Sequence, residues 1–152
     1  MRLLTDLLPA DKALPSRRRT YLRSRLHGTD IDPFALELAR LSLTLTDILN
    51  PDGWDLKAEN MFLGDRLATQ AKGNSILLLN PPFDNFTPED RLAYAGKSAK
   101  ATFTNKAAEV LWRTLPQLPE GGVFGVVLPQ TILHSDNAAA LRKLIVEEFE
   151  LK

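Results

Sequence analysis

The chain has 152 residues, a length that suits one domain and allows a sizeable hydrophobic core. Its 44% hydrophobic and 25% charged residues are ordinary for a globular protein, and its net charge of zero provides no global field toward nucleic acid or membrane. The absence of cysteine excludes disulfides and thiolate chemistry and fits a reducing compartment such as the cytoplasm. No apolar run approaches the roughly 18–20 residues of a membrane span. Two histidines without cysteine argue against a structural zinc site.

The N-terminal part of the chain predicts two helices around a basic stretch and a strand. Apolar residues at positions 3, 4, 7 and 8 have helical spacing, and Pro9 ends that helix. The basic stretch 16–25 leads into a short strand, 25–30. A helix over 32–45 follows, with Asp32 as N-cap and Pro33 at its first position. Its apolar residues on one face are Phe34, Leu38, Leu41 and Leu45.

The middle of the chain predicts two more strands. "NPDG" at 50–53 is a turn signal, and the alternating residues of "WDLKAE" predict a strand over 54–59. "SILLL" at 75–79 is continuously apolar, as a strand covered on both faces is. A short helix then begins with Thr87 as its cap and Pro88 at its first position.

The remaining segments continue the alternation of helix and strand. Residues 93–102 are small and polar, and we expect them to be mobile. A helix over 104–118 is followed by "PEGG", a strand over 123–128 and a final helix over 135–149. This order predicts a single α/β domain with a mostly parallel sheet and helices on both faces.

Ligands bind such sheets at the carboxyl ends of the strands, where several polar residues stand here. Asp30 ends the first strand, and an acid at a strand end commonly accepts hydrogen bonds from ribose hydroxyls. The alternative is that Asp30 only turns the chain. Asn60 and Met61 follow the next strand, where an amide and a thioether fit a purine edge and ring. Equally, Asn60 can be an exposed loop amide and Met61 a core methionine. If the strand runs longer, Asp65 takes the polar role instead.

The segment "NPPF" ends the most apolar strand and raises a chemical possibility. Asn80 and the backbone carbonyl of Pro81 are two acceptors for the hydrogens of an aromatic amine. The Pro81 ring fixes φ, and Pro82 restricts Pro81 to extended conformations, so the loop is rigid before a substrate binds. Phe83 supplies a ring on which a planar base can stack. The alternative is a stiff turn with Phe83 in the core.

Other polar residues have simpler explanations. The arginines of the basic stretch are suited to phosphate contact, yet a charge run is more often a solvated face. His27 and His134 are interpreted as strand or loop residues rather than catalysts. The helix residue Trp112 is interpreted as packing.

Four segments together resemble S-adenosylmethionine-dependent adenine-N6 DNA methyltransferases of the restriction-modification type. They are "GTDIDPFALELARLSLTL", "AENMF", "NPPF" and "GGVFGVVLPQTILHS…LRKLIVEEF", and the resemblance spans residues 22–151. It implies a Rossmann-like methyltransferase sheet with S-adenosyl-L-methionine as cofactor and DNA as partner. Asp30 would bind the cofactor ribose. Ile31, Asn60 and Met61 would contact its adenine, and Asn80, Pro81, Pro82 and Phe83 would hold the flipped target adenine.

The chain also departs from that family. No glycine-containing strand end, which would hold the methionine part of the cofactor, precedes "GTDID". The sequence stops where a sixth strand would begin, and no target-recognition domain follows. We therefore expect a central fragment, inactive alone, from a truncated gene, a split gene or an expressed piece. The absent strand would lie between the Asp30 and NPPF strands. We expect these two strands to pair directly, the chain to associate with a partner subunit, or the chain to be poorly stable.

Two alternatives to DNA methylation stay open. NPPF also occurs in ribosomal RNA guanine methyltransferases, and protein glutamine methyltransferases carry the related NPPY. The chain is also consistent with a degenerate, non-catalytic methyltransferase domain that binds a partner.

Overall fold

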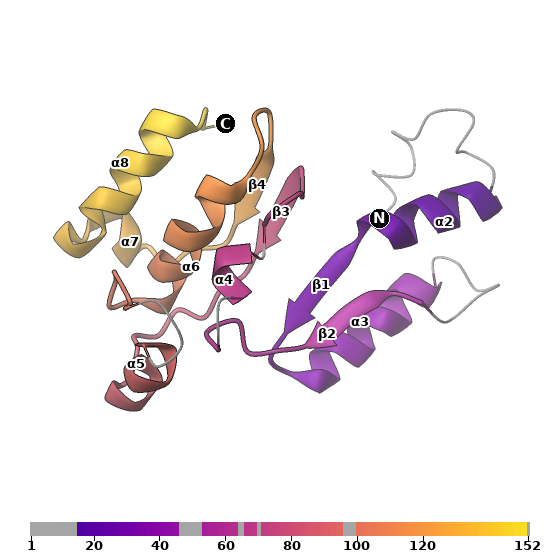
Figure 1. Cartoon of the computed structure of the whole chain (residues 1–152), viewed down its shortest axis with the longest axis horizontal. Helices are drawn as coiled ribbons and strands as arrows, with labels where there is room; N and C mark the ends of the chain where they lie inside the picture. The colour runs from indigo at the N-terminus through magenta and orange to yellow at the C-terminus, as the bar shows by residue number, and fades with distance from the viewer. Residues whose placement is uncertain (1–14, 46–52, 64–65, 70, 96–99, 152) are drawn as a thin grey trace. The chain divides into compact units, whose positions relative to one another are not determined.

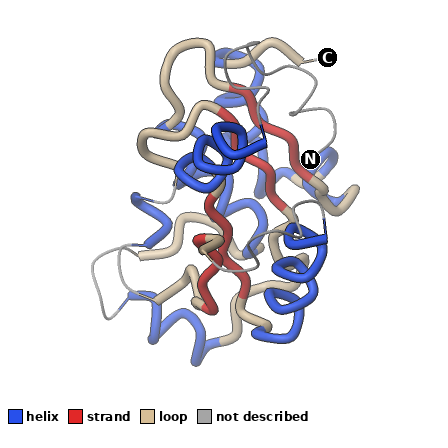
Figure 2. Tube along the Cα trace, turned by 90° about the vertical axis from the view of Figure 1, so that its right-hand side faces the viewer, coloured by secondary structure: helices blue, strands red, loops and turns tan. Residues whose placement is uncertain are grey.

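The structure places one pair of parallel strands in each half of the chain. A computed structural model describes residues 15–45, 53–63, 66–69, 71–95 and 100–151. The chain divides into two units, a first unit of Met1–Met61 and a second unit of Phe62–Lys152. The strands of each pair run side by side in both views (Figures 1 and 2). The helix predicted over 1–8, the turn positions 50–52 and Asp65 lie outside the described residues.

The first unit contains two helices and two strands. In chain order they are α2 (Pro15–Arg25), β1 (His27–Asp30), α3 (Pro33–Leu45) and β2 (Asp55–Ala58). β1 and β2 are parallel, with His27 opposite Asp55 and Asp30 opposite Ala58. The buried apolar side chains of this unit are Leu22, Leu36, Trp54 and Leu56. The predicted strands are confirmed in position, each shorter than the sequence pattern.

Helix α3 begins as predicted but packs with a different face. Asp32 caps it, because its Oδ1 accepts a hydrogen bond of 2.9 Å from the Phe34 N–H. The packed face contains Leu36, with Ala39 and Leu43 beside it. The apolar stripe read from the sequence is exposed, at 68% for Phe34, and it also includes Leu38, Leu41 and Leu45. The helix carries two apolar stripes, both with helical spacing, so periodicity alone does not select the packed one.

The second unit contains more elements than the sequence predicted. They are α4 (Arg66–Thr69), β3 (Ile76–Leu79), α5 (Pro88–Ala95), α6 (Lys106–Thr114), η2 (Leu115–Gln117), β4 (Val123–Val126), α7 (Thr131–His134), η3 (Asp136–Ala138) and α8 (Ala139–Glu148). The short helices α4 and α7 were not predicted. The predicted cap of α5 is confirmed, since Thr87 Oγ1 accepts from the Asp90 N–H at 3.1 Å.

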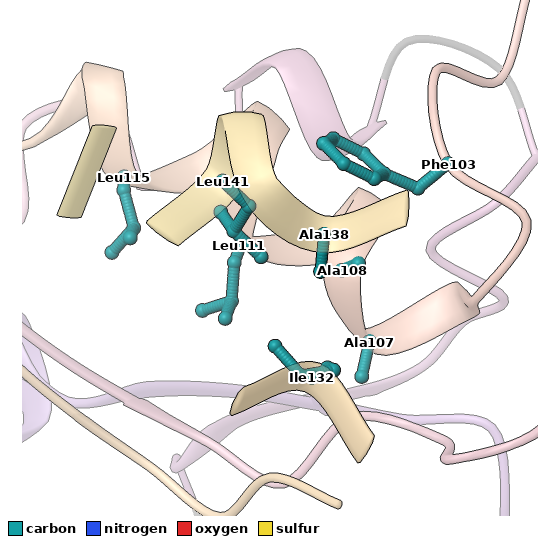
Figure 3. Close-up of a cluster of buried hydrophobic side chains, with 8 residues drawn as sticks. All are labelled: Phe103, Ala107, Ala108, Leu111, Leu115, Ile132, Ala138 and Leu141. Carbon is teal, nitrogen blue, oxygen red and sulfur yellow. The ribbon is translucent and has the colours of Figure 1, made fainter. Parts of the chain in front are cut away.

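The core of the second unit lies between α6, α7 and α8 and one face of the β3–β4 pair. Leu111, Leu115, Ile132 and Leu141 project into it (Figure 3). Leu79, Phe124 and Val126 of the strands pack against this cluster. A positive φ of 75° at Gly121 makes the turn that returns the chain to β4.

Two features of the predicted sheet differ in the structure. β3 was expected to be covered on both faces, but Ile76 is 57% and Leu78 78% exposed, so only the face toward α6 and α8 is covered. One sheet was expected, whereas among the described residues β1 pairs only with β2 and β3 only with β4. The Asp30 and NPPF strands belong to different units, so their expected direct pairing stays a prediction.

The core cluster predicts a large effect of truncating Leu111, which is 0% exposed. Leu111→Ala is expected to reduce the free energy of unfolding of the second unit by about 2–5 kcal/mol, because it removes buried atoms and leaves a cavity. Urea unfolding would be followed by the fluorescence of Trp112 in a Trp54→Phe background. Leu133→Ala, at a leucine that is 59% exposed, is the matched control. Equal effects of the two truncations would contradict this account of the core.

Candidate functional site

The first set of predicted site residues lies at the carboxyl ends of β1 and β2. The two strands are parallel, so Asp30 and Ala58 end them at the same edge. The Glu59 N–H donates to the Asp30 carbonyl at 2.8 Å and extends the pairing by one step. Asn60 and Met61 follow directly. The structure thus brings together the residues predicted for cofactor binding in the first unit.

The Asp30 side chain is exposed and oriented by the backbone. Its Oδ1 accepts a hydrogen bond of 2.9 Å from the Asp32 N–H. A carboxylate has two oxygens and about four lone-pair sites, so this single bond leaves acceptor capacity for hydroxyl groups. Ile31 beside it is 69% exposed and presents an apolar side chain. The edge therefore offers an acidic acceptor next to an apolar surface.

The second set of predicted residues forms the loop after β3. Asn80 is exposed, Pro81 is buried and Pro82 is exposed. Phe83 is 47% exposed, so the alternative that places it in the core is wrong. The Val127 N–H donates to the Leu79 carbonyl at 3.1 Å, which extends the β3–β4 pairing to the point where the loop leaves the sheet.

A second segment holds the backbone just after this loop. The Phe86 N–H donates to the Thr104 carbonyl at 2.9 Å, and the Lys106 N–H donates to the Asp84 carbonyl at 3.0 Å. Asn105 Nδ2 donates to the Phe83 carbonyl at 2.8 Å. The chain from Phe83 to Phe86 is therefore paired with the start of α6.

Side chains reinforce the same pairing. Lys106 Nζ contacts Asp84 Oδ2 at 2.6 Å and Asp90 Oδ2 at 2.8 Å, and its bond to Asp90 lowers the pKa of that carboxyl. Phe86 is buried and packs against Phe62, with ring centroids 5.1 Å apart, and against Tyr94, at 5.6 Å. The residues that follow the loop are thus held by the charge pairs of Lys106 and by the aromatic cluster around Phe86.

Sequence reasoning missed the most buried charged residue of this region, Glu109, which is 0% exposed. Its Oε2 accepts from the N–H groups of Thr102 and Phe103 at 2.8 and 2.9 Å. Its Oε1 accepts from the Tyr94 hydroxyl at 3.1 Å and from Arg113 Nε at 2.9 Å. The available signal was an acidic residue among buried positions of α6, with an arginine one turn later.

The remaining polar residues singled out from the sequence have structural contacts. His27 Nδ1 lies 2.7 Å from Asp55 Oδ2 at the start of β1 and β2, away from the Asp30 edge. In the basic stretch, the Arg23 guanidinium lies over the Trp54 ring at 5.5 Å.

Within the described ranges, no group of acidic, histidine or cysteine side chains is arranged to hold a metal ion. No helix in the described part of the chain is long and apolar enough to cross a membrane.

Comparison with known protein families identifies a match over most of the chain. The model of the family described as N-6 DNA Methylase matches residues 6–152. No curated protein and no solved structure matches the chain.

The Glu109 network predicts an unusual titration of Tyr94. Burial raises the pKa of the Tyr94 hydroxyl to about 12, and the neighbouring Glu109 carboxylate also raises it. The unfolded chain ionises this tyrosine near 10. Between these values the folded state keeps a proton that the unfolded state has lost, so the free energy of unfolding falls as pH rises.

This behaviour can be measured because the chain has only two tyrosines, Tyr21 and Tyr94. The difference between the tyrosinate absorbance titrations of the unmodified chain and of Tyr94→Phe isolates Tyr94. The expected midpoint is about 12. Tyr21→Phe is the control and should leave this high midpoint in place. A Tyr94 midpoint near the ordinary value would show that the hydroxyl is not held in the buried network.

Proposed function

Because the chain belongs to the N-6 DNA methylase family, we propose that it provides catalytic parts of an adenine-N6 DNA methyltransferase of the restriction-modification type. The observation that carries the proposal is the loop from Asn80 to Phe83. Its aromatic ring is exposed, while its backbone is anchored to α6. An exposed ring at a fixed place is what a planar base needs in order to stack beside a polar group.

The carboxyl edge of β1 and β2 fits the proposed cofactor. S-adenosyl-L-methionine, when bound, supplies a methyl group on a positively charged sulfur, which departs as a neutral thioether. Asp30 has acceptor capacity for its ribose hydroxyls, and the exposed Ile31 offers an apolar surface for its adenine ring. In the same proposal, Asn60 and Met61 contact the edge and face of that ring.

Asn80 and Pro81 have the proposed catalytic role. The lone pair of an aromatic amine is delocalised into the ring, which makes the nitrogen a poor nucleophile. Acceptors aimed at its two hydrogens favour a more tetrahedral nitrogen with a localised lone pair. The Asn80 side-chain oxygen and the Pro81 carbonyl are the proposed acceptors. The new N–C bond forms as the old S–C bond breaks, and one amine proton leaves to water, so no covalent enzyme intermediate is needed.

Phe83 and Pro82 are proposed to receive the target base outside the DNA duplex. Flipping a base costs a few kcal/mol, and stacking on an aromatic ring offsets part of that cost. Phe83 is half-exposed, so its ring can be covered by a base. The rigid backbone on either side keeps the cost of ordering the loop low.

The proposal includes a partner subunit for the strand edges. Among the described residues, β1 with β2 and β3 with β4 form two-stranded sheets, and the edges of such short sheets can pair with a further strand. We propose that a strand of a partner subunit, carrying the glycine loop for the methionine part of the cofactor, pairs with one of these edges and is needed for activity. A cytoplasmic location is part of the same proposal.

Cofactor binding tests the role of Asp30. S-adenosylmethionine titrated into the full chain by calorimetry is expected to bind weakly. Asp30→Ala should weaken binding by about tenfold or more, because hydrogen bonds to a carboxylate are lost. Asp55→Ala, at the opposite end of the same strand pair, is the control and should bind like the unmodified chain. Binding that is unaffected by Asp30→Ala would contradict the proposed ribose contact.

Methyl transfer tests the role of Asn80 and the choice of substrate. In the presence of the proposed partner subunit, duplex DNA should accept methyl groups in preference to RNA or a glutamine-containing peptide. Asn80→Ala should lower the transfer rate by about 10²–10³-fold, the usual effect of losing one preorganised polar contact to a transition state. Asn137→Ala, at an exposed asparagine of η3, is the control. A preference for RNA or for the peptide would contradict the proposal that DNA is the substrate.

A further inference from the structure

The side chain of Asn105 makes hydrogen bonds that join the NPPF loop to α6. Its Nδ2 donates to the Phe83 carbonyl at 2.8 Å and lies 3.5 Å from the Asp84 carbonyl. Its Oδ1 accepts from the Ala108 N–H at 3.1 Å, which makes Asn105 the N-cap of α6. One amide group thus contacts the backbone of the loop and the end of a helix at the same time.

We propose that Asn105 is a positioning residue that sets the place of the Phe83 ring for the target base. The inference rests on the proposed function of the NPPF loop and adds a residue outside that motif to it. Phe83 is 47% exposed, so core packing does not fix its ring. The position of the ring then depends on the backbone of Phe83, and the Asn105 amide bonds to that backbone directly.

The chemistry of the loop explains why a donor from outside is needed. Pro81 and Pro82 have no N–H groups, so the middle of the loop cannot be held by donating hydrogen bonds. Its carbonyl groups are the backbone groups that remain for hydrogen bonding, and a donor from another segment can hold one of them in place. The Asn105 amide supplies that donor at Phe83, at the point where the loop leaves the two prolines.

The start of α6, which carries Asn105, is itself fixed in the structure. Ala107 and Ala108, in the first turn of α6, are buried at 0% and 1% exposure. Glu109 fixes the approach to the helix through the N–H groups of Thr102 and Phe103. Asn105 therefore transmits the position of a buried helix to an exposed loop.

An asparagine suits both bonds, which allows the two roles to be separated. The cap needs an acceptor, and the Phe83 carbonyl needs a donor. The carboxylate introduced by Asn105→Asp keeps an acceptor for the cap and is favourable at a helix N-terminus, but it has no donor when ionised. Asn105→Asp should therefore keep α6 and release Phe83. Asn137→Asp makes the same chemical change at an exposed asparagine and is the matched control.

Amide hydrogen exchange on the full chain measures the contact directly. In Asn105→Asp, the N–H groups of Phe86 and Lys106 should exchange at least about tenfold faster, because they bond across the pairing that Asn105 anchors. The amides of Leu111 and Leu115 should keep their rates, since α6 remains capped. Unchanged exchange at Phe86 and Lys106, or equal acceleration throughout α6, would overturn the inference.

Base stacking provides the readout that a purely structural role would not change. The probe is a short single-stranded oligonucleotide with one 2-aminopurine, whose fluorescence is quenched when it stacks on an aromatic ring. The unmodified chain and Asn137→Asp should quench it, Phe83→Ala should not, and Asn105→Asp should lose at least about half of the quenching. Full quenching by Asn105→Asp would overturn the positioning role while leaving the role of Phe83 intact.

The Phe83→Ala variant tests the proposed function of the loop separately from the role of Asn105. If the unmodified chain and Phe83→Ala behave alike toward the probe, Phe83 does not bind the base, and the positioning role proposed for Asn105 is overturned with it. Faster exchange at Phe86 in Asn105→Asp would then establish a structural contact only.

Discussion

The buried carboxylate of Glu109 is the interaction on which the loops of the second unit depend. A carboxylate removed from water is stable only when donors surround it, and here two backbone N–H groups, a tyrosine hydroxyl and an arginine do so. These donors come from α5, from the segment before α6 and from α6 itself. Satisfying one charge therefore fixes three parts of the chain relative to one another, and the start of α6 becomes a rigid reference for its neighbours.

The NPPF loop uses that reference. Its exposed ring has no core to hold it, and its prolines have no N–H groups to donate. Rigidity instead comes from contacts with the start of α6, through the Asn105 amide and the Lys106 ammonium. A side chain can thus be exposed for a ligand and still have a defined place, because its order comes from the backbone behind it. The same reasoning applies to Asp30, whose carboxylate is exposed but oriented by the Asp32 N–H.

The features that short segments determine were predictable from the sequence. Asp32 and Pro33 start α3, Thr87 and Pro88 start α5, and the strand ends place Asp30 and Asn80 where they were expected. Features that depend on contacts between residues far apart in the sequence were not predictable. The packed face of α3 depends on β1 and β2, and the burial of Glu109 depends on Thr102 and Tyr94. The role of Asn105 was hidden for the same reason, since its partner Phe83 lies before α5 in the chain.

Pro81 and Pro82 also act before the protein is folded. During synthesis β3 is made well before β4, so its apolar residues lack their strand partner while α5 and α6 are being added. A short apolar strand in this state is prone to pair with other chains. Proline cannot donate a hydrogen bond to a growing ladder, so two of them directly after the strand prevent its extension. The residues that stiffen the loop in the folded protein thus stand where gatekeeper residues protect an apolar strand of a nascent chain.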